Sequence, residues 1–280
     1  MTSVRTVGEV FEAIQQAKTA ATAFTTNFFP VQAKLQSWID RSELLGEFRN
    51  GVASFLRKDR NFCHYYFAAG NPPQLERELG NIPQLKSEPV VMDVVGSESV
   101  LTDLLRAIES AGFRRYARLV RLARPHAASL SSAQPPNPNS SPAPAVLRAE
   151  STDSEAILRL LESSFNPYAD QLPELYEIEE AISRQQILTV KISAALAALL
   201  YFETQGVTST VRYWAVAEQF RALRLGSVLM RHYFSAQQAV RRFVLWVTAA
   251  NETALQKYQH YGYAPDGLVD HVLANPLIPS

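Results

Sequence analysis

The sequence predicts an α/β fold made of two domains. Short runs rich in β-branched and aromatic residues alternate with stretches whose apolar residues recur every three or four positions. This alternation occurs on both sides of a segment at 125–145 that is rich in proline and serine. The chain has 280 residues, of which 47% are hydrophobic and 19% charged, so it is long enough for two domains of ordinary size.

The segment between the two predicted domains has a composition that cannot form a core. Its central part, Ser131–Pro144, contains no charged residue and shows no apolar periodicity. Proline fixes φ and lacks a backbone donor, while serine and asparagine bring no apolar surface to bury. We therefore expect an extended linker at 125–145, which joins a first domain at 1–124 to a second domain at 146–280.

The second domain is expected to follow the order β-α-α-β-β-β-α-β-α-β. A strand near Ala145–Ala149 leads to a helix for which Thr152 or Asp153 is the expected N-cap. A second helix follows the loop bracketed by Pro167 and Pro173. The later elements are expected as strands at 187–192, 195–204 and 211–217, a helix from 225 to 234, a strand at 243–248 and a helix at 253–261.

The first domain has a related pattern. Helical periodicity is expected at 7–24 and 100–111, and strands at 51–57, 62–68 and 90–95. The helix–glycine–aromatic ending at Gly112-Phe113 is similar to the one at Gly262-Tyr263. Two interpretations stay open: a weak internal repeat, or the ordinary way in which a helix ends at a glycine.

The most informative stretch is Phe220–Met230, which follows the strand-like run Val211–Ala217 and opens a helix. A turn from strand to helix presents unpaired backbone N–H groups and the positive end of the helix dipole, and both bind phosphate. Arg221 and Arg224 add positive charge there. The sequence therefore indicates a phosphate-binding loop at the start of this helix.

This loop, taken with Asn251, Tyr258 and Gly262-Tyr263 further along, resembles the GNAT acyltransferase superfamily. Members carry an Arg/Gln-x-x-Gly-x-Gly/Ala loop after a strand and wrap it around the pyrophosphate of acyl-coenzyme A. The resemblance covers about residues 146–272. It implies a central mixed, mostly antiparallel sheet flanked by helices, and it makes the first domain a candidate for a degenerate GNAT-like domain without such a loop.

The loop matches the family pattern at Arg221 and Gly226 and departs from it at two positions. Arg224 stands where the family usually has glycine, and Ala222 stands where glycine is frequent. A glycine lets a ligand approach the backbone closely, whereas a side chain obstructs it. An outward-pointing Arg224 could instead bind a phosphate as a forked, charged donor.

The resemblance also implies roles for individual residues. The strand backbone that would hold the pantetheine and donate to the oxyanion is that of Trp214, Ala215 and Val216. The residues that would hold the pyrophosphate are Arg221, Ala222, Leu223, Arg224, Leu225, Gly226 and Ser227. Asn251 and Ala254 would also contact the coenzyme. Tyr258 would be the general acid that protonates the departing thiolate.

The general base is left open by the sequence. We select Glu203, which ends a strand near the expected cleft, while Glu218 and His232 are alternatives and many family members use a chain of waters. Acidic residues also gather in the first part of the second domain, at Glu150, Asp153, Glu155, Glu162, Asp170, Glu174, Glu177, Glu179 and Glu180. They indicate either an acidic entry that attracts an amine or a solvated helix face.

The implied function is that of an acyl-CoA-dependent N-acyltransferase, expected to be an N-acetyltransferase. It would transfer the acyl group from acetyl-CoA to a primary amine of a small molecule, an amino acid or a peptide by direct attack. One alternative is a catalytically silent GNAT-like module for ligand binding or assembly. Another is an enzyme that forms aminoacyl or peptide bonds with paired GNAT-like domains.

Composition narrows the expected partners and location. A formal net charge of zero argues against nucleic acid, and the longest apolar run, 192–202, is too short to span a bilayer. The start of the chain shows no signal peptide, and the single cysteine, Cys63, is compatible with a reducing cytoplasm. We expect Cys63 to be a core residue rather than a nucleophile paired with His64. The five histidines lack metal-ligand spacing, so we expect no metal; a homodimer is compatible with the sequence.

Overall fold

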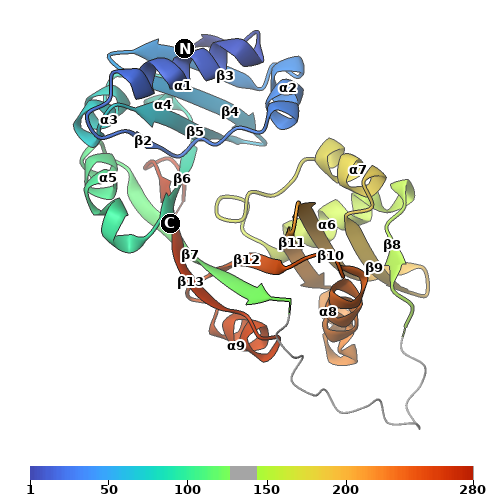
Figure 1. Ribbon diagram of the computed structural model, residues 1–280. Coiled ribbons are helices and arrows are strands. Elements are labelled where there is room, and N and C mark those ends of the chain that lie inside the picture. The colour runs from blue at the N-terminus through green and yellow to red at the C-terminus, as the bar shows by residue number, and fades with distance from the viewer. Residues whose placement is uncertain (127–143, 280) are drawn as a thin grey trace. The chain divides into compact units, whose positions relative to one another are not determined.

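The computed structural model describes residues 1–126 and 144–279 (Figure 1). Most of the linker expected at 125–145 lies outside these residues. By its internal contacts the chain divides into unit 1, which comprises Met1–Leu119 and Leu268–Ser280, and unit 2, which comprises Val120–Gly267. The last segment of the chain thus belongs to unit 1, whereas the sequence analysis placed all of 146–280 in the second domain.

Unit 1 contains a mixed sheet with helices packed against it. Its elements in chain order are β1 (Thr2–Ser3), α1 (Val7–Thr19), β2 (Thr25–Thr26), α2 (Gln32–Asp40), β3 (Leu44–Arg49), β4 (Val52–Asp59), β5 (Phe62–Ala69), α3 (Pro72–Leu79), α4 (Gln84–Ser87), β6 (Val90–Gly96), α5 (Glu98–Ser110) and the first part of β7 (Arg114–Pro125). The strand order is β1-β3-β4-β5-β6-β13, where β13 is Ala264–Ala274, and β2 also pairs with β5. Only β5 and β6 are parallel within this order.

Unit 2 repeats this plan. Its elements in chain order are the last part of β7, then β8 (Leu147–Arg148), the 3₁₀ turn η1 (Ser151–Asp153), α6 (Ser154–Ser164), α7 (Leu175–Ser183), β9 (Ile187–Ile192), β10 (Ala195–Gln205), β11 (Thr208–Val216), the 3₁₀ segment η2 (Glu218–Leu223), α8 (Leu225–Ala236), β12 (Arg242–Thr248), α9 (Glu252–His260) and the start of β13. The strand order is β7-β12-β11-β10-β9-β8. The β11–β12 pair is parallel, whereas β8, β9, β10 and β11 pair antiparallel.

Both segments of the chain follow the order β-α-α-β-β-β-α-β-α-β, apart from short additions such as β2 and α4. The predicted α/β fold with a mixed, mostly antiparallel sheet flanked by helices is therefore confirmed. The shared order also favours the internal repeat over the simpler interpretation of the Gly112-Phe113 ending.

Some expected elements have different limits in the structure. The helix expected over 7–24 ends at Thr19, because Thr25 and Thr26 leave the helical path and pair with Ala69 and Ala68 of β5. Of the two expected N-caps of the first helix of unit 2, the structure has Asp153, since residues 151–153 form a tighter 3₁₀ turn and the helix begins at Ser154.

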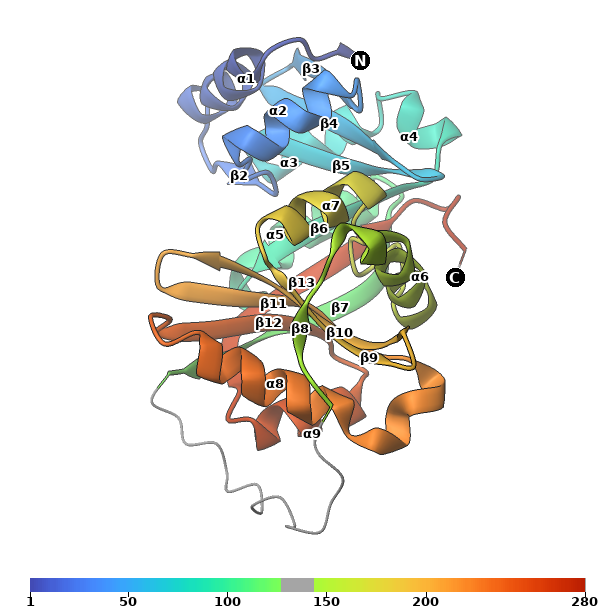
Figure 2. The ribbon, with the colours of Figure 1, turned by 90° about the vertical axis from the view of Figure 1, so that its right-hand side faces the viewer.

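The core of unit 2 lies on both faces of its sheet. Figure 2 shows α8 and α9 on one side of the strands and α6 and α7 on the other. On the α8 face, Tyr233 packs in one buried cluster with Phe202 and Phe243. On the α6 face, Ile157 packs in a second cluster with Tyr201. Helices on both faces explain why β9 and β10 read as nearly continuous apolar runs.

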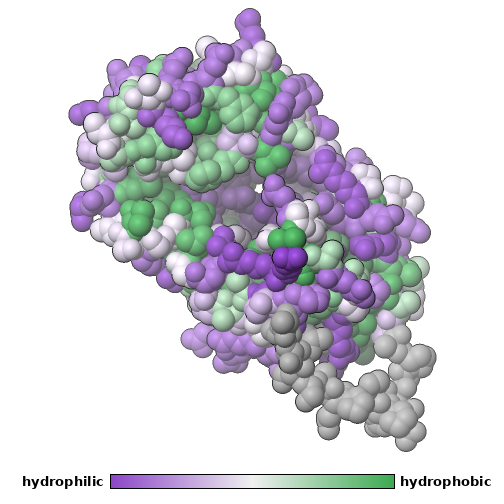
Figure 3. All heavy atoms as spheres, viewed as in Figure 1, coloured by the Kyte–Doolittle hydropathy of each residue, from purple (hydrophilic) through white to green (hydrophobic). Residues whose placement is uncertain are grey.

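The surface of the molecule is mixed in character. In Figure 3 hydrophilic residues are spread over the visible face of both units, which accords with 27 basic and 27 acidic residues in the sequence. None of the helices in the described parts of the chain has the length and hydropathy that a membrane span requires.

Candidate functional site: a parting of two parallel strands

The parallel strands β11 and β12 pair only at one end. Their register runs from Thr208 opposite Arg242 to Val211 opposite Leu245. Beyond that point β11 continues to Val216 and β12 to Thr248. Within 144–267 no strand pairs with this edge of β11, so its backbone N–H and C=O groups on that side are open to another partner.

A bulge in β11 begins where this pairing ends. Phe202 of β10 lies opposite Val211, but the next residue of β10, Tyr201, lies opposite Tyr213, so Arg212 is the extra residue. A bulge bends a strand and changes which face its side chains reach. Val211 and Trp214 consequently pack on the α8 face, although strict alternation would place them on opposite faces.

Tyr213 and Ala215 pack on the other face of β11, against α6 and α7. The three residues predicted to hold pantetheine, Trp214, Ala215 and Val216, therefore all lie on the part of β11 that has separated from β12. The bulge in β11 and its separation from β12 together leave the backbone edge of β11 unpaired at these residues.

Gly226, in the first turn of α8, permits a close contact with β11. A Cβ atom added there would lie 2.8 Å from Cζ2 of Trp214, which is closer than such atoms approach. The indole Nε1 of Trp214 is buried and has no hydrogen-bond partner among the described residues. Gly226 therefore allows the Trp214 ring to lie against the helix, and the ring brings an unsatisfied donor to the site.

Arg224 adopts the left-handed conformation, with φ 54° and ψ 25°. This is a backbone shape that glycine adopts without strain and that other residues adopt at a cost. The chain thus keeps the backbone shape suited to glycine at the position where the family usually has one. The side chain of Arg224 is exposed, as are those of Ala222 and Leu223.

The start of α8 carries positive charge. Arg221 is 67% exposed, and its nearest carboxylate, Glu218, is 3.9 Å away. The backbone N–H of Ser227 donates to the carbonyl of Arg224 at 3.0 Å, while α8 itself begins at Leu225. The first N–H groups of a helix lack intrahelical acceptors, so two exposed arginines stand beside a helix end that attracts anions.

Asn251 has a clear structural role. Its Oδ1 accepts the backbone N–H of Ala254 at 3.0 Å and caps the start of α9. Its side-chain nitrogen has no hydrogen-bond partner in the described chain and is available as a donor. The predicted contact of Asn251 and Ala254 with a coenzyme stays a prediction.

Tyr258 of α9 lies partly buried between aromatic rings. Its ring centroid is 5.6 Å from that of Trp214 and 5.9 Å from that of Tyr263. Burial, with the nearby carboxylate of Asp170, raises the pKa of the Tyr258 phenol above its ordinary value. The phenol therefore keeps its proton at neutral pH.

Glu203 lies on the opposite face from Tyr258, beside Tyr201. Its Oε1 accepts the Tyr201 hydroxyl at 3.3 Å and lies 3.9 Å from Nε of Arg212. The Glu203 side chain is 47% exposed. The two alternatives, Glu218 and His232, are exposed on η2 and α8.

Sequence reasoning did not single out Asp170, which lies in the connection between α6 and α7. Tyr213 of β11 donates its hydroxyl to the backbone carbonyls of Asp170 at 3.1 Å and Gln171 at 2.6 Å. Burial raises the pKa of the Asp170 carboxyl above the ordinary aspartate value. The only sequence signal was its membership of the acidic set at 150–180, which does not distinguish it from the eight other members.

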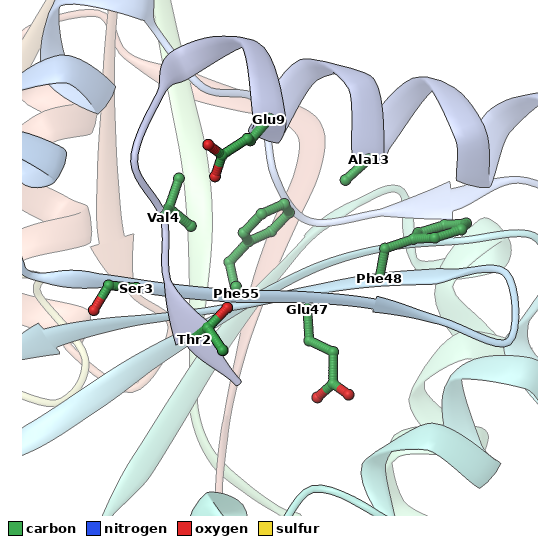
Figure 4. Close-up of a pocket in the computed structure, with 9 residues that line it drawn as sticks. Thr2, Ser3, Val4, Glu9, Ala13, Glu47, Phe48 and Phe55 are labelled. Atoms are coloured by element: carbon green, nitrogen blue, oxygen red, sulfur yellow. The ribbon is translucent and has the colours of Figure 1, made fainter.

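Unit 1 holds a separate pocket, shown in Figure 4, in which Glu9 and Ala13 of α1 face Phe48 and Phe55, while the Glu47 side chain points away from α1. None of the predicted site residues lines it.

Cys63 of unit 1 is buried as expected, and its Sγ donates to Glu88 at 3.2 Å. Burial, with that carboxylate, raises the pKa of the thiol to about 12, so it stays protonated. Within 1–126 and 144–279, no three His, Cys, Asp or Glu residues are grouped to hold a metal ion.

No known protein-family pattern and no curated protein sequence matches the chain. Solved structures do resemble it. A tandem GNAT protein from the clavulanic acid biosynthesis pathway matches 100% of this chain over 98% of its own, at 10% identity and a TM-score of 0.63. A GCN5-related N-acetyltransferase from Kribbella flavida matches 93% of this chain over 95% of its own, at 15% identity and a TM-score of 0.56.

A GCN5-related N-acetyltransferase from Sphaerobacter thermophilus matches 82% of this chain over 78% of its own, at 13% identity and a TM-score of 0.54. At these identities the likeness concerns the fold. The chain has a GNAT-like fold, and the match of its full length to a tandem protein shows that it contains two such domains.

Proposed function

We propose that unit 2 binds acyl-coenzyme A, as acetyl-CoA, and transfers the acyl group to a primary amine. The observation that carries this proposal is the separation of β11 from β12 directly before the positively charged start of α8. An extended chain with amide groups can pair with an open strand edge, and a pyrophosphate suits a helix end flanked by arginines. Pantetheine and pyrophosphate are joined in one molecule in this order.

The residues present fit such a ligand. The open edge at Trp214, Ala215 and Val216 offers backbone donors and acceptors to the pantetheine amides, and the buried Nε1 of Trp214 lacks a partner that a ligand oxygen would supply. The backbone from Arg221 to Ser227 would hold the pyrophosphate, with two guanidinium groups as charged donors.

Bound acetyl-CoA would supply an activated thioester, so the protein needs to contribute few groups. The β11 backbone would orient the acyl carbonyl and donate to its oxygen as negative charge develops. Tyr258 is protonated at neutral pH, and it is the candidate that the family resemblance implies for protonating the departing sulfur. Glu203 is the sequence-based candidate for the group that accepts the amine proton.

The proposal also covers location and partners. We propose action in the cytoplasm on an amine acceptor, without nucleic acid, metal or membrane as a partner. The single cysteine is compatible with a reducing compartment, and the net charge of zero argues against nucleic acid. A homodimer is part of this proposal as well, and light scattering of the purified chain would test it.

Calorimetric titration of acetyl-CoA into the purified chain tests the proposal. We expect binding of one equivalent with a micromolar dissociation constant. Arg221→Ala should weaken it about tenfold or more, because a hydrogen bond to a charged group contributes about 1.5 to 3 kcal/mol. Arg106→Ala is the matched control, since Arg106 is an exposed arginine on α5 that pairs with Asp103.

Absence of binding to acetyl-, longer acyl- and free coenzyme A would overturn the proposal. The chain would then be a binding or assembly module that keeps the fold without the phosphate site. Where binding is found, release of free thiol in the presence of a panel of amines, amino acids and peptides tests the transfer itself.

A further inference from the structure

We propose that Asp170, rather than Glu203, is the general base of unit 2, and that it acts from the face of β11 opposite to Tyr258. This inference rests on the proposed function. The structure supports it through the placement of the α6–α7 connection, the two faces of β11, and the gap beside that strand.

The connection that carries Asp170 is fixed to β11. The Tyr213 hydroxyl donates to two successive carbonyls, those of Asp170 and Gln171, and the Tyr213 ring contacts Phe165 at a centroid distance of 5.3 Å. Oδ2 of Asp170 accepts the backbone N–H of Asn166 at 2.8 Å. These contacts hold the carboxyl group on one face of the strand and leave Oδ1 without a hydrogen-bond partner in the described chain.

Asp170 and Tyr258 therefore approach β11 from its two faces. Asp170 is held by Tyr213, which packs against α6 and α7, whereas Tyr258 contacts the next residue, Trp214, which packs on the α8 face. The edge of β11 between these positions has no paired strand on the β12 side. The negative charge of Asp170 contributes to the raised pKa of the Tyr258 phenol.

This arrangement suits the two proton transfers of an acyl transfer. As the bond from nitrogen to the acyl carbon forms, the amine must lose a proton, and as the bond from carbon to sulfur breaks, the thiolate must gain one. The amine proton goes to Asp170, and the thiolate takes the proton of Tyr258. One proton moved afterwards from Asp170 to the tyrosinate through water restores both groups. The acceptor would approach from the α6 and α7 face, opposite the Tyr258 side.

The surroundings of Asp170 make it a better base than an ordinary aspartate. Burial raises its pKa toward the working pH, and a base is most effective when its pKa lies near that pH. The titratable groups that interact with it are Tyr213 of β11 and Tyr258 of α9, and Tyr213 in turn interacts with Arg212 of β11 and Glu177 of α7. Glu203 also lies on the face opposite to Tyr258, but it is about half exposed and lies 3.9 Å from Arg212, so it lacks this burial.

Steady-state kinetics of Asp170→Asn and Glu203→Gln, as a matched pair, test the inference. We expect Asp170→Asn to lower kcat by about 10²- to 10⁴-fold, the usual contribution of a general base. It should also remove the acidic limb of the kcat pH profile and leave the calorimetric affinity for acetyl-CoA unchanged. Glu203→Gln should lower kcat by less than about fivefold and keep that limb.

Tyr213→Phe gives an independent result, because it releases the connection without touching the carboxyl group. As a variant of a positioning residue it should lower kcat while the apparent pKa of the acidic limb shifts. The inference is overturned if Asp170→Asn retains the acidic limb and most of its kcat, or if Glu203→Gln causes the larger loss. Failure of the wild-type chain to bind acetyl-CoA would instead overturn the proposed function, and the calorimetric measurement separates the two cases.

Discussion

Unit 1 and unit 2 share an order of elements but differ at the place where their parallel strands part. In unit 1, β5 and β6 pair only at Cys63 opposite Val90 and His64 opposite Val91. The gap is then filled by Asn27, whose Nδ2 donates to the carbonyls of Tyr65 and Asp93, both at 3.0 Å. The same topology therefore separates the two parallel strands in both units, but in unit 1 the gap between them is filled by Asn27.

The two units also differ at the start of the helix that follows the first of these parallel strands, which is α3 after β5 and α8 after β11. In unit 1, α3 begins with Pro72 and Pro73, which have no N–H groups to offer, and Asn71 caps the helix by accepting from the Gln74 N–H at 2.9 Å. In unit 2 the connection is longer and carries Arg221 and the left-handed Arg224. The fold supplies the position of the proposed coenzyme site, and a few local residues decide whether that position is open.

Asn27→Ala should produce the largest change in stability, and it should be confined to unit 1. The variant loses two donated hydrogen bonds and the one that Oδ1 accepts from the Phe67 N–H at 2.7 Å. At about 1 kcal/mol each, the local loss is about 3 kcal/mol. Hydrogen exchange followed by mass spectrometry should show faster exchange in β5 and β6 and no change in β11 and β12.

Acetyl-CoA stoichiometry sharpens this result. The Asn27→Ala chain should still bind one equivalent, because α3 of unit 1 lacks a phosphate-binding start. Asn71→Ala serves as the comparison and should cost only about 1 kcal/mol, the usual contribution of an N-cap. A second bound equivalent would contradict the conclusion that the start of α3 cannot bind phosphate, and unchanged exchange in β5 would show that Asn27 does not hold the gap between β5 and β6 closed.

Gly226→Ala and Gly8→Ala form a second comparison between the units. The new methyl group at Gly226 would meet the Trp214 ring at 2.8 Å, whereas at Gly8 in α1 the nearest atom is Oγ1 of Thr6 at 3.7 Å. We expect Gly226→Ala to destabilise unit 2 by about 2 kcal/mol through overpacking and to weaken acetyl-CoA binding. Gly8→Ala should stabilise α1 by about 0.5 kcal/mol, because alanine favours helices.

Thermal unfolding with and without acetyl-CoA measures both variants. Equal midpoints for Gly226→Ala and the wild-type chain would mean that α8 and β11 move apart at little cost. In that case the close contact with Trp214 would not explain the glycine.

Much of this comparison could be predicted from sequence, and some of it could not. The apolar periodicity of unit 2 predicted its strands and helices, because apolar spacing reports directly on secondary structure. The charged start of α8 was predicted from Arg221 and Arg224. The bulge at Arg212 gave no sequence signal, since it is defined only by the register with β10. The role of Asn27 and the position of Asp170 depend on contacts across 40 or more residues, such as Phe67 with Asn27 and Tyr213 with Asp170.

The limits of the units were hidden for the same reason. Residues 264–274 read as one continuous strand, but the end of that strand pairs with β6 of unit 1, with His271 opposite Val94 and Ala274 opposite Val91. The apolar periodicity of a strand is the same whichever strand it pairs with. The limits of the units depend on these pairing partners, and one sequence does not contain that information.

The buried Asp59 and the partly buried Asp170 should respond to pH in opposite directions. Burial alone would raise the pKa of Asp59 in unit 1, but its hydrogen bond to His64 and the charges of Arg57 and Arg60 lower it. Asp59 therefore stabilises the folded chain at neutral pH, and this contribution is lost as the pH falls through its folded pKa. Asp59→Asn should cost about 1.5 kcal/mol at neutral pH and progressively less in acid.

For Asp170 the sign is reversed. Its folded pKa is raised, so the folded chain holds this proton more tightly than the unfolded chain does. Its stabilising contribution is complete below the ordinary aspartate pKa of about 3.9 and is lost as the pH rises through the folded pKa. Asp170→Asn should therefore be more stable than the wild-type chain at neutral pH. Urea unfolding at a series of pH values measures both variants, and parallel pH dependences would refute the assignment of opposite environments.

The smallest expected change in stability concerns Arg224, compared with Ser42 of unit 1. Both have positive φ, 54° and 58°, and both are exposed, so replacement by glycine should relieve similar strain and stabilise each unit by about 0.5 to 1 kcal/mol. The two variants should differ in acetyl-CoA affinity. Ser42→Gly should leave it unchanged, whereas Arg224→Gly should weaken it about tenfold if the guanidinium binds a phosphate.

The direction of the Arg224→Gly effect discriminates between the two functional hypotheses. Weaker binding means that the arginine replaces the usual glycine in function, because the backbone already has the left-handed shape and the side chain adds a charged donor. Stronger binding means that the side chain obstructs the loop, as expected of a module whose phosphate site has decayed. Since Ser42→Gly corrects for strain relief alone, the calorimetric difference between the two variants isolates the contribution of the Arg224 side chain.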